Sequence, residues 1–267
     1  MATHLIPPPI ALTIAGSDSG GGAGIQADLK TFHQFGVHGT SVIVAITAQD
    51  TVAVRAVHLV PADIISAQIA AVADDLPPTA IKTGMLVTAE LIRLVASAIR
   101  ERDWNRYVLD PVMVASSGDR LLAADAESVL RNVLLPLATL VTPNLDEAEA
   151  LTGGRVRNPD EMEAAGHRLL ELGAGAALIK GGHLEGDVIV DLLILPGKAR
   201  RFNHPRIATG STHGTGCTLS AAITAGLALG RSLDRAVEDG LGYVHRAIET
   251  AVPLGKGHGP VNHRISP

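Results

Sequence analysis

A Gly-rich stretch near the C-terminus places a cysteine beside a set of backbone N–H donors. It reads Thr212-His213-Gly214-Thr215-Gly216-Cys217 and runs into an apolar segment of small residues. Two glycines let the backbone turn tightly enough to aim several N–H groups at one point, and the helix expected after them adds its dipole there. The stretch therefore predicts an anion hole suited to a phosphate. A Gly-rich turn with an inert buried cysteine is the alternative that these six residues leave open.

Cys217 is the ionisable group at the mouth of this predicted anion hole. Positive potential from the N–H donors favours a thiolate, and a base beside an anion cradle suits phosphoryl transfer to a hydroxyl. We expect Cys217 to be catalytic together with Gly214, Thr215 and Gly216, and Thr212 and His213 to bind a nucleotide. His213 is expected to be a structural or phosphate-adjacent donor rather than a base. His183, His213 and His258 lack partners at zinc-site spacing, so no zinc site is predicted.

A second Gly-rich loop follows the first predicted strand. Gly22, Gly24 and Ala27 fit the Gly-x-Gly-x-x-Gly/Ala fingerprint of dinucleotide enzymes. The acidic residue expected about 20 positions later is only loosely supplied by Asp50, and Asp28 would bring a carboxylate close to a pyrophosphate. The loop equally suits a neutral small molecule with hydroxyl or amine donors. The downstream anion hole, which a dinucleotide dehydrogenase does not need, favours the small molecule.

Polar side chains also follow three of the predicted strands. Asp110 ends one strand, and Asn144 and Glu147 follow another, spaced to face the same side of a first helical turn. Together they can orient a magnesium ion through its waters, although an N-cap Asn with acidic first-turn residues is the alternative. Lys180 can reach a phosphate from a strand end, where a lone Lys would otherwise be solvated. Open α/β sheets bind ligands at this edge, so the residues together predict a phosphotransferase site.

Apolar runs alternate with amphipathic segments along the whole chain. We expect strands at residues 10–15, 41–47, 80–82, 107–110, 139–142 and 177–180, and helices at residues 24–35, 62–73, 89–102, 160–172, 215–229 and 233–250. Residues 188–195 and 200–202, joined by a turn at 196–198, are expected to form an antiparallel hairpin at a sheet edge. The alternation predicts a mostly parallel sheet covered by helices on both faces. Without a linker or repeat, residues 1–267 are expected to form one domain with a short tail at 1–9.

Composition excludes several classes of function. Of the 267 residues, 46% are hydrophobic and 18% charged, which is ample for a buried core, and only 2% are aromatic, so aliphatic side chains must fill it. A net charge of −5 without a basic cluster argues against nucleic acid as the partner. A single cysteine excludes an intrachain disulfide and fits a reducing cytoplasm. No uninterrupted apolar run of about 18 residues is present, so no membrane span is expected.

In their order along the chain, these motifs resemble the ribokinase-like superfamily, and within it the hydroxymethylpyrimidine/phosphomethylpyrimidine kinases of thiamine biosynthesis. The resemblance is carried by Ala11–Asp18, Gly21–Lys30, Lys82–Leu86, Val108–Met113, Thr142–Asn144, Lys180–His183, Thr212–Ser220 and Gly255–Pro260. It implies a three-layer α/β/α fold, ATP with Mg²⁺, and a homodimer. It also implies phosphorylation of 4-amino-5-hydroxymethyl-2-methylpyrimidine, first on its alcohol and then on the resulting monophosphate.

The resemblance also implies roles for individual residues. Gln49 would read the aminopyrimidine, because a primary amide can donate to a ring nitrogen and accept from an exocyclic amine. Asp28 would hold the hydroxymethyl arm, and Gly16, Met85 and Val112 would line the ring pocket. Asp110, Asn144 and Glu147 would serve Mg²⁺ and the phosphates, with Lys180 on the nucleotide phosphates. Cys217 would stand where sugar kinases of the superfamily carry an aspartate base.

Two alternatives remain open on the sequence. Pyridoxal-type kinases share the fold and some share the Gly-Thr-Gly-Cys loop, and a catalytically silent nucleotide sensor would keep the pocket. Residues 115–119 are expected to form a flap, and they read Ala-Ser-Ser-Gly-Asp where the family often has Lys before Ser-Gly. Flap closure over phosphate is therefore expected to be weaker. The first loop departs from the family at Ser17–Gly20, a change expected to be silent.

Overall fold

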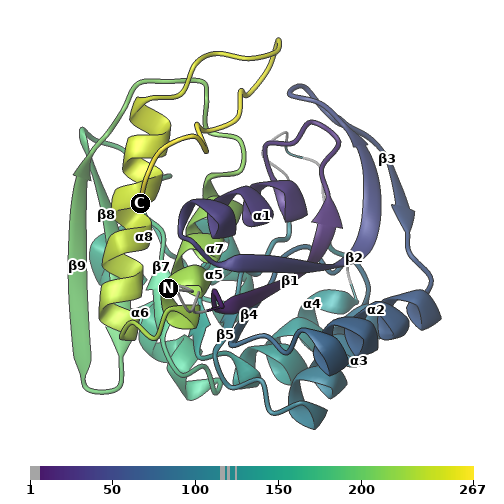
Figure 1. Ribbon diagram of the computed structural model, residues 1–267. Helices are drawn as coiled ribbons and strands as arrows, with labels where there is room; N and C mark the ends of the chain where they lie inside the picture. The colour runs from purple at the N-terminus through teal and green to yellow at the C-terminus, as the bar shows by residue number, and fades with distance from the viewer. Residues whose placement is uncertain (1–6, 115–117, 119–120, 124) are drawn as a thin grey trace, which may run out of the picture.

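The computed structural model describes residues 7–114, 118, 121–123 and 125–267. In the described residues a nine-stranded sheet runs through the centre of the molecule in the order β3-β2-β1-β4-β5-β6-β7-β8-β9 (Figure 1). The strands are β1 (Ile10–Ser17), β2 (His38–Gln49), β3 (Val54–Leu59), β4 (Ala80–Thr83), β5 (Tyr107–Leu109), β6 (Leu140–Val141), β7 (Ala177–Ile179), β8 (Val188–Leu195) and β9 (Lys198–Pro205). The predicted flap at 115–119 lies, apart from Gly118, outside the described residues.

Six neighbouring strands of the sheet, from β2 to β7, run parallel, and each edge adds antiparallel pairing. β1 pairs in parallel with both β2 and β4, and the parallel ladder continues through β5 and β6 to β7. At one edge β3 returns antiparallel to β2, and at the other β8 and β9 form the predicted hairpin. The parallel strands therefore bring their carboxyl ends, and the loops that follow them, to one end of the molecule.

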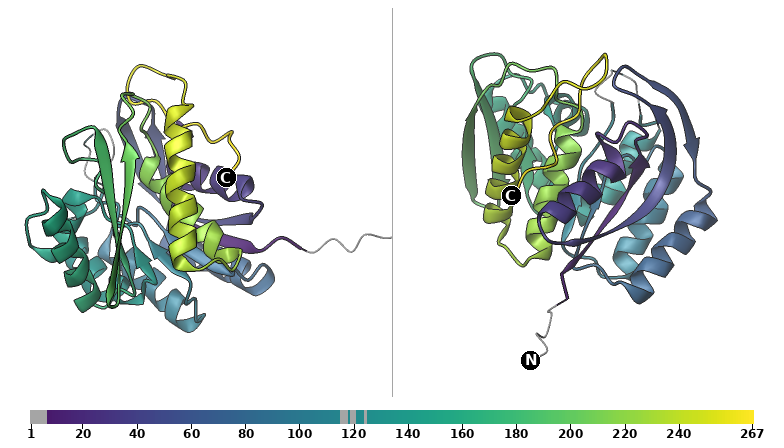
Figure 2. Two further views of the ribbon diagram at one scale, coloured as in Figure 1. Left: turned by 90° about the vertical axis from the view of Figure 1, so that its left-hand side faces the viewer. Right: turned by 45° about the horizontal axis from the view of Figure 1, so that its top comes forward.

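Helices cover both faces of this sheet and complete three layers (Figure 2). The helices α1 (Gly24–Gln34), α7 (Thr215–Ala228) and α8 (Leu233–Glu249) share one apolar cluster with one face. The other face carries α2 (Ala62–Asp75), α3 (Ala89–Glu101), α4 (Ala126–Val129), a π turn (Leu130–Leu134), a 3₁₀ turn (Leu135–Leu137), α5 (Leu145–Thr152) and α6 (Pro159–Glu171). The predicted three-layer α/β/α architecture is confirmed. No helix in the described part of the chain is long and apolar enough to cross a membrane.

Helix α7 owes its central place to its sequence. Eleven of its fourteen residues are buried, and these are mainly Ala, Leu, Ile, Thr and Ser. Small side chains let the helix approach both the sheet and its neighbours, α1 and α8, at close range. Gly240 of α8 is an example. A Cβ added at this position would lie only 3.1 Å from Cγ1 of Ile223 in α7, so the two helices are closely packed here. Because residues 218–228 are packed on all sides, we expect the helix to be rigid, and its N-terminus can hold a site in a fixed position.

Three parts of the structure were not predicted. Strand β3 is exposed along nearly its whole length, and therefore lacks the alternating apolar pattern that marks a half-buried strand. The segment from α4 through the π and 3₁₀ turns changes helix type within twelve residues, which blurs its 3.6-residue periodicity. Helix α5 has only eight residues, and the residues of its first turn were interpreted as possible metal ligands rather than as the start of a helix of this length.

Candidate active site

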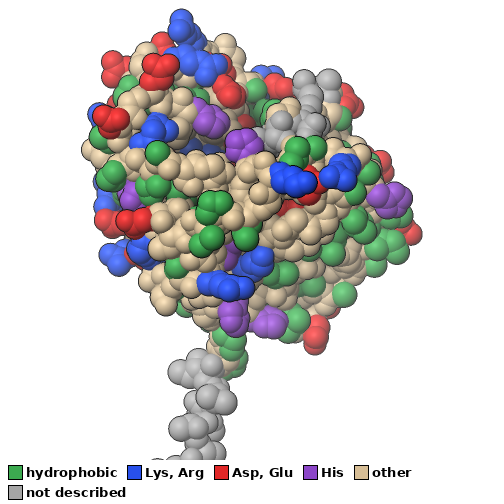
Figure 3. All heavy atoms as spheres, turned by 90° about the horizontal axis from the view of Figure 1, so that it is seen from above, with side chains coloured by type: hydrophobic (Ala, Val, Ile, Leu, Met, Phe, Trp, Pro, Cys, Tyr) green, Lys and Arg blue, Asp and Glu red, His purple; other side chains and the backbone are tan. Residues whose placement is uncertain are grey.

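The loops after the parallel strands β1, β2, β4, β5, β6 and β7 lie at the carboxyl end of the sheet, together with the N-terminus of α7. Figure 3 looks onto this end of the molecule, where basic, acidic and His side chains are scattered among hydrophobic side chains and stretches of backbone. The topology brings the sequence-predicted residues to this one end from positions far apart in the chain.

The anion-hole loop is held in an uncommon backbone conformation. Gly214 is the N-cap of α7 with φ +82°, and a Cβ at this position would overlap the carbonyl oxygen of Gly22. Only glycine fits such a left-handed, crowded position. The Thr215 hydroxyl donates to the Thr212 carbonyl at 2.6 Å and closes the turn. The first N–H groups of α7, which have no acceptor within the helix, therefore open toward the strand ends.

Lys180 and two carboxylates lie beside this helix terminus. The Nζ of Lys180 is 3.4 Å from Asp110 Oδ1 and 3.9 Å from Glu147 Oε2. A Cβ added to Gly216 would lie 3.3 Å from the same Nζ, so the ammonium group rests against the anion-hole backbone. Ser220, one turn into α7, donates to Asp110 Oδ2 at 3.2 Å. The structure thus brings Asp110, Glu147, Lys180 and Gly216 together.

Asn144 and Glu147 form the first turn of α5 as a capping box. The Asn144 side chain accepts from the Glu147 N–H at 2.9 Å, and Glu147 Oε2 accepts from the Asn144 N–H at 2.7 Å. The N-cap alternative is therefore confirmed for Asn144, whose amide oxygen is engaged within the helix. Burial raises the pKa of Glu147 to about 7, with the charge of Asp110 adding to the effect. Its carboxyl group keeps one side toward Lys180, so it serves both the helix and the site.

The donor set fits a magnesium ion of the kind held jointly by protein and phosphates. No cluster of three or more His, Cys, Asp or Glu side chains in the described part of the chain can hold a metal alone. Magnesium usually takes only one or two carboxylates from the protein and keeps waters and substrate phosphates as its other ligands. Asp110 and Glu147, two buried carboxylates facing one Lys, supply that number with an excess of negative charge.

Asp28 forms a buried ion pair with Lys82. It is fully buried, its Oδ1 lies 2.7 Å from the Nζ of Lys82, and its Oδ2 accepts from the Thr13 hydroxyl at 2.6 Å. In this conformation the Asp28 carboxylate has no exposed surface and is paired with the buried Lys82 ammonium group. Its contact with a hydroxymethyl arm stays a prediction.

Cys217 lies close to this buried pair. Burial raises the pKa of its thiol to about 12, although the charge of Lys82 and a hydrogen bond from the Gly24 N–H lower it. Burial of the thiol therefore opposes the predicted thiolate, whereas Lys82 and the Gly24 N–H favour it. Lys82 stays charged, since Asp28, Cys217 and Asp110 raise its pKa against the effect of burial.

His213 is a structural residue. Its Nε2 lies 2.8 Å from Asp18 Oδ2, and its ring is buried against Gly22 and Pro260. Asp18 also accepts from the N–H groups of Gly20, Gly22 and Ala23 at 2.8 to 3.0 Å. With its Nε2 engaged in this way, His213 does not offer that atom to a nucleotide, and its nucleotide-binding role stays a prediction. The pair fastens the first loop to the anion-hole loop.

The residues expected around a pyrimidine lie on neighbouring strand ends. A Cβ at Gly16 would overlap the Met85 methyl group, so these two residues form one wall. Gln49 ends β2, its backbone bonded to Ser19 and its side-chain oxygen 3.3 Å from the Thr47 hydroxyl. Val112 is half-buried two residues after Asp110.

Two functional candidates, Lys82 and Asp18, were missed as site residues. A Lys inside the apolar strand Ala80–Thr83 is the signal that could have marked the first, because a buried ammonium needs a buried partner. Asp18 stands before Gly20-Gly21-Gly22, where a carboxylate commonly caps the loop N–H groups.

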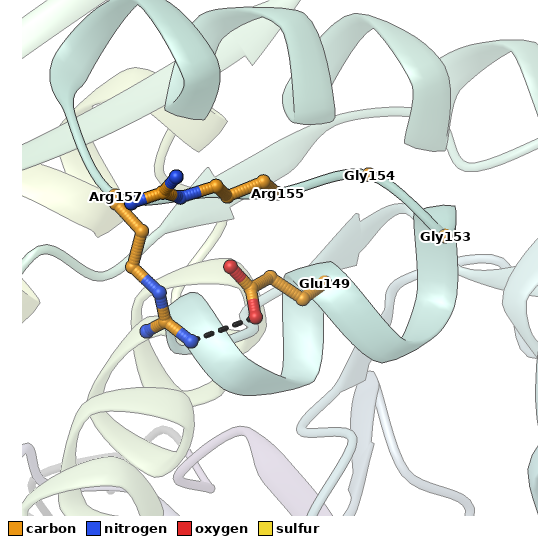
Figure 4. Close-up of a pocket in the computed structure, with 5 residues that line it drawn as sticks. All are labelled: Glu149, Gly153, Gly154, Arg155 and Arg157. Carbon is orange, nitrogen blue, oxygen red and sulfur yellow. Dashed lines mark hydrogen bonds and ion pairs between the residues drawn. The ribbon is translucent and has the colours of Figure 1, made fainter.

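A separate cavity of about 400 Å³ lies at the end of α5, lined by Glu149, Gly153, Gly154, Arg155 and Arg157 (Figure 4). The guanidinium of Arg157 is engaged by Asp146 and Glu149 at 2.9 and 2.8 Å. None of the predicted site residues lines this cavity, so it is distinct from the candidate active site.

Comparison with known proteins gives a consistent result. The family model described as phosphomethylpyrimidine kinase matches residues 18–262. A hydroxymethylpyrimidine/phosphomethylpyrimidine kinase of Rhizobium meliloti is 52% identical over 257 residues, covering 95% of this chain and 96% of the relative. Its Bacillus subtilis namesake is 47% identical over 254 residues, covering 95% and 94%. The solved ADP complex of Bacillus subtilis pyridoxal kinase superposes with a TM-score of 0.91 at 40% identity, covering 96% of this chain and 98% of that one.

Proposed function

Because this chain belongs to the phosphomethylpyrimidine kinase family, we propose that it phosphorylates 4-amino-5-hydroxymethyl-2-methylpyrimidine in two steps. The first step transfers the γ-phosphoryl group of ATP to the hydroxymethyl oxygen. The second transfers another γ-phosphoryl group to the monophosphate and yields the diphosphate used in thiamine biosynthesis. The observation that carries the proposal is the meeting of Lys180, Asp110 and Glu147 with the N-terminus of α7.

In the first step the hydroxymethyl oxygen forms a bond to the γ-phosphorus while the bond from that phosphorus to ADP breaks. The N–H groups of Gly216 and Cys217 and the ammonium of Lys180 stabilise charge on the transferring group. A magnesium ion, held by Asp110 and Glu147, would supply further charge neutralisation. The Cys217 thiol first loses its own proton to solvent water, because its residue is only half-buried, and the resulting thiolate then accepts the hydroxyl proton. Lys82 and the Gly24 N–H are the groups that lower the cost of that loss.

Substrate recognition is assigned to Gln49 and the wall formed by Gly16 and Met85. A pyrimidine stacked on this wall meets the Gln49 amide with a ring nitrogen and an amino group, which one amide can serve at the same time. Pyridoxal is the competing substrate class, since a pyridoxal kinase is among the similar structures. The curated relatives named for the pyrimidine are more similar in sequence, at 47% and 52%, and favour the pyrimidine.

The test is a two-substrate comparison. The purified protein is incubated with ATP and Mg²⁺ and either the hydroxymethylpyrimidine or pyridoxal, and phosphorylated products are separated by chromatography. We expect both pyrimidine phosphates to form, with a higher kcat/KM than for pyridoxal. ATP consumption with pyridoxal alone would reassign the substrate, and no turnover with either would favour the silent sensor.

We also propose that the enzyme is a homodimer that acts in the cytoplasm. Strand β3 ends the sheet without a further strand among the described residues, and the ribbon that it forms with β2 exposes apolar side chains. They include Ile46, Val57 and Leu59, and Ile64 of α2, a helix that contacts β2, is also exposed. Edge strands of this kind pair readily with another chain, and a second copy offers the same surface. The single cysteine fits a reducing compartment.

A further inference from the structure

The C-terminal segment Gly255–Pro260, hereafter the strap, connects two parts of the site that are remote in sequence. In Figures 1 and 2 the yellow segment before the C-terminus reaches the turn between β2 and β3. At one end the strap therefore meets the turn that follows Gln49. At the other it joins the loop that precedes the anion hole, where the His213 N–H donates to the Gly259 carbonyl at 2.9 Å.

Thr51 holds the first end of the strap with three hydrogen bonds. Its hydroxyl accepts from the N–H groups of Lys256 and Gly257 at 3.1 and 3.2 Å. Its carbonyl accepts from the His258 N–H at 2.8 Å. The approach is so close that a Cβ at Gly255 or Gly257 would overlap Thr51. Two of the glycines in this motif are therefore explained by Thr51.

These contacts complete a closed ring. Ser19 bonds the backbone of Gln49 through its hydroxyl, at 2.6 Å to the carbonyl and 2.8 Å from the N–H. Two residues further on, Thr51 binds the strap, and the strap binds His213. His213 returns to Asp18, the neighbour of Ser19, at 2.8 Å. The ring thus joins Gln49 to the loop that carries Gly214 by two routes. One runs through Thr51 and the strap, and the other runs through the first loop at Ser19 and Asp18.

We propose that Thr51 is a positioning residue for both phosphoryl transfers, because it closes the ring that fixes Gln49 relative to the anion hole. The inference rests on the proposed function, in which Gln49 orients the pyrimidine and the anion hole receives the phosphoryl group. Displacing a bound substrate by about 1 Å can cost about 10²-fold in rate. Holding these two loops together is therefore worth a measurable part of the catalysis.

The test compares Thr51→Val, which removes the hydroxyl, with Thr51→Ser, which keeps it. We expect Thr51→Val to lower kcat/KM for the pyrimidine in both half-reactions by about 10- to 100-fold, and Thr51→Ser to restore most of it. Thr250→Val is the matched control. Thr250 accepts from the Asn262 side chain at 3.1 Å outside the ring, so its variant should stay within about twofold of the wild type. An unchanged kcat/KM in Thr51→Val overturns the proposal.

A second variant separates the ring from a local contact. Ser19→Ala opens the ring at another link, and a ring that is already open loses little more when opened again. The double variant Ser19→Ala/Thr51→Val should therefore be slowed by much less than the product of the two single effects. Fully multiplicative effects would mean two independent contacts and would reject the ring.

Amide hydrogen exchange tests the same proposal without an activity measurement. In Thr51→Val, exchange should accelerate at residues 256–258 and also at Gln49 and His213, on the far links of the ring. Acceleration confined to residues 256–258 would contradict the coupling. If the wild type fails to phosphorylate the pyrimidine while exchange still spreads around the ring, the proposed substrate fails and the coupling stands.

Discussion

At the scale of single residues, the site is organised around charges buried below it. Lys82 and Asp28 form an ion pair without solvent contact, although removing two charges from water is costly. Both charges act on the nearby thiol of Cys217. Lys82 lowers the pKa of this thiol and Asp28 raises it, which gives the buried pair a role in the site. Asp110 also raises that pKa, and Lys180 lies close enough to interact with Cys217. The charged groups that interact with Cys217 thus come from four separate segments of the chain.

The pKa of Cys217 can be measured by alkylation, because it is the only cysteine in the chain. A thiol with a pKa of about 12 should react with iodoacetamide at a rate that still rises tenfold per pH unit up to pH 10. Asp28→Asn should accelerate the reaction and Lys82→Met slow it, since they remove charges of opposite sign. A plateau below pH 8 would show a stabilised thiolate instead. Shifts of the same sign in both variants would show only general loosening.

Cys217→Ala separates the two phosphorylations. The alcohol is neutral at pH 7 and gains from a base, whereas the monophosphate, with a second pKa of about 6, is already largely ionised. We expect the variant to slow alcohol phosphorylation by on the order of 10²-fold or more, and to slow the monophosphate step much less. Each half-reaction is measured separately. Equal losses in both steps would mean that Cys217 only packs at the start of α7.

At the scale of elements, the Glu147 side chain of α5 has two roles, in capping the helix and in the proposed metal site, and two variants can separate them. Glu147→Gln keeps an oxygen to accept the Asn144 N–H but removes the charge, whereas Glu147→Ala removes both. Both variants should therefore raise the Mg²⁺ concentration needed for half-maximal activity. Only Glu147→Ala should also lose stability, by about 1 kcal/mol for the broken capping box. A thermal melt and a Mg²⁺ titration of each variant check this, and an unchanged Mg²⁺ requirement in Glu147→Gln would remove Glu147 from the metal site.

Elements with strong apolar patterns were predictable, and those set by contacts between distant segments were not. The parallel strands and the long helices α3, α6 and α8 repeat apolar residues at strand or helix spacing, so local pattern and tertiary packing agree. Strand β3 is fixed by pairing with β2 alone, and its own side chains carry no pattern. The site shows the same division. Strand-end positions located Asp110 and Lys180, but nothing local reveals that Asp28 faces Lys82, 54 residues away.

At the scale of the whole molecule, the ribbon of β2 and β3 is an edge of the sheet that exposes apolar side chains. Hydrophobic side chains gather along the right-hand side of Figure 3, the side on which β3 lies in Figure 1. Gln49 and Thr51 follow directly along this ribbon and its turn. A partner chain packed against it would also stiffen the pyrimidine-reading end of β2. Oligomeric state and substrate recognition are therefore expected to depend on the same edge.

Val57→Asp tests this dependence, with Val252→Asp as its control. Val57 lies in β3 and is 43% exposed, whereas Val252 is 69% exposed in the segment after α8 and belongs to neither β2 nor β3. Both variants place a charge on the surface, but only Val57→Asp would bury one in the proposed dimer, which is costly without a partner. By light scattering after gel filtration, the wild type and Val252→Asp should have twice the mass of the chain, and Val57→Asp the mass of one. If Val57→Asp remains dimeric, the contact lies elsewhere. If it becomes a monomer, its KM for the pyrimidine should rise while its KM for ATP stays unchanged, because the edge supports Gln49 and not Lys180.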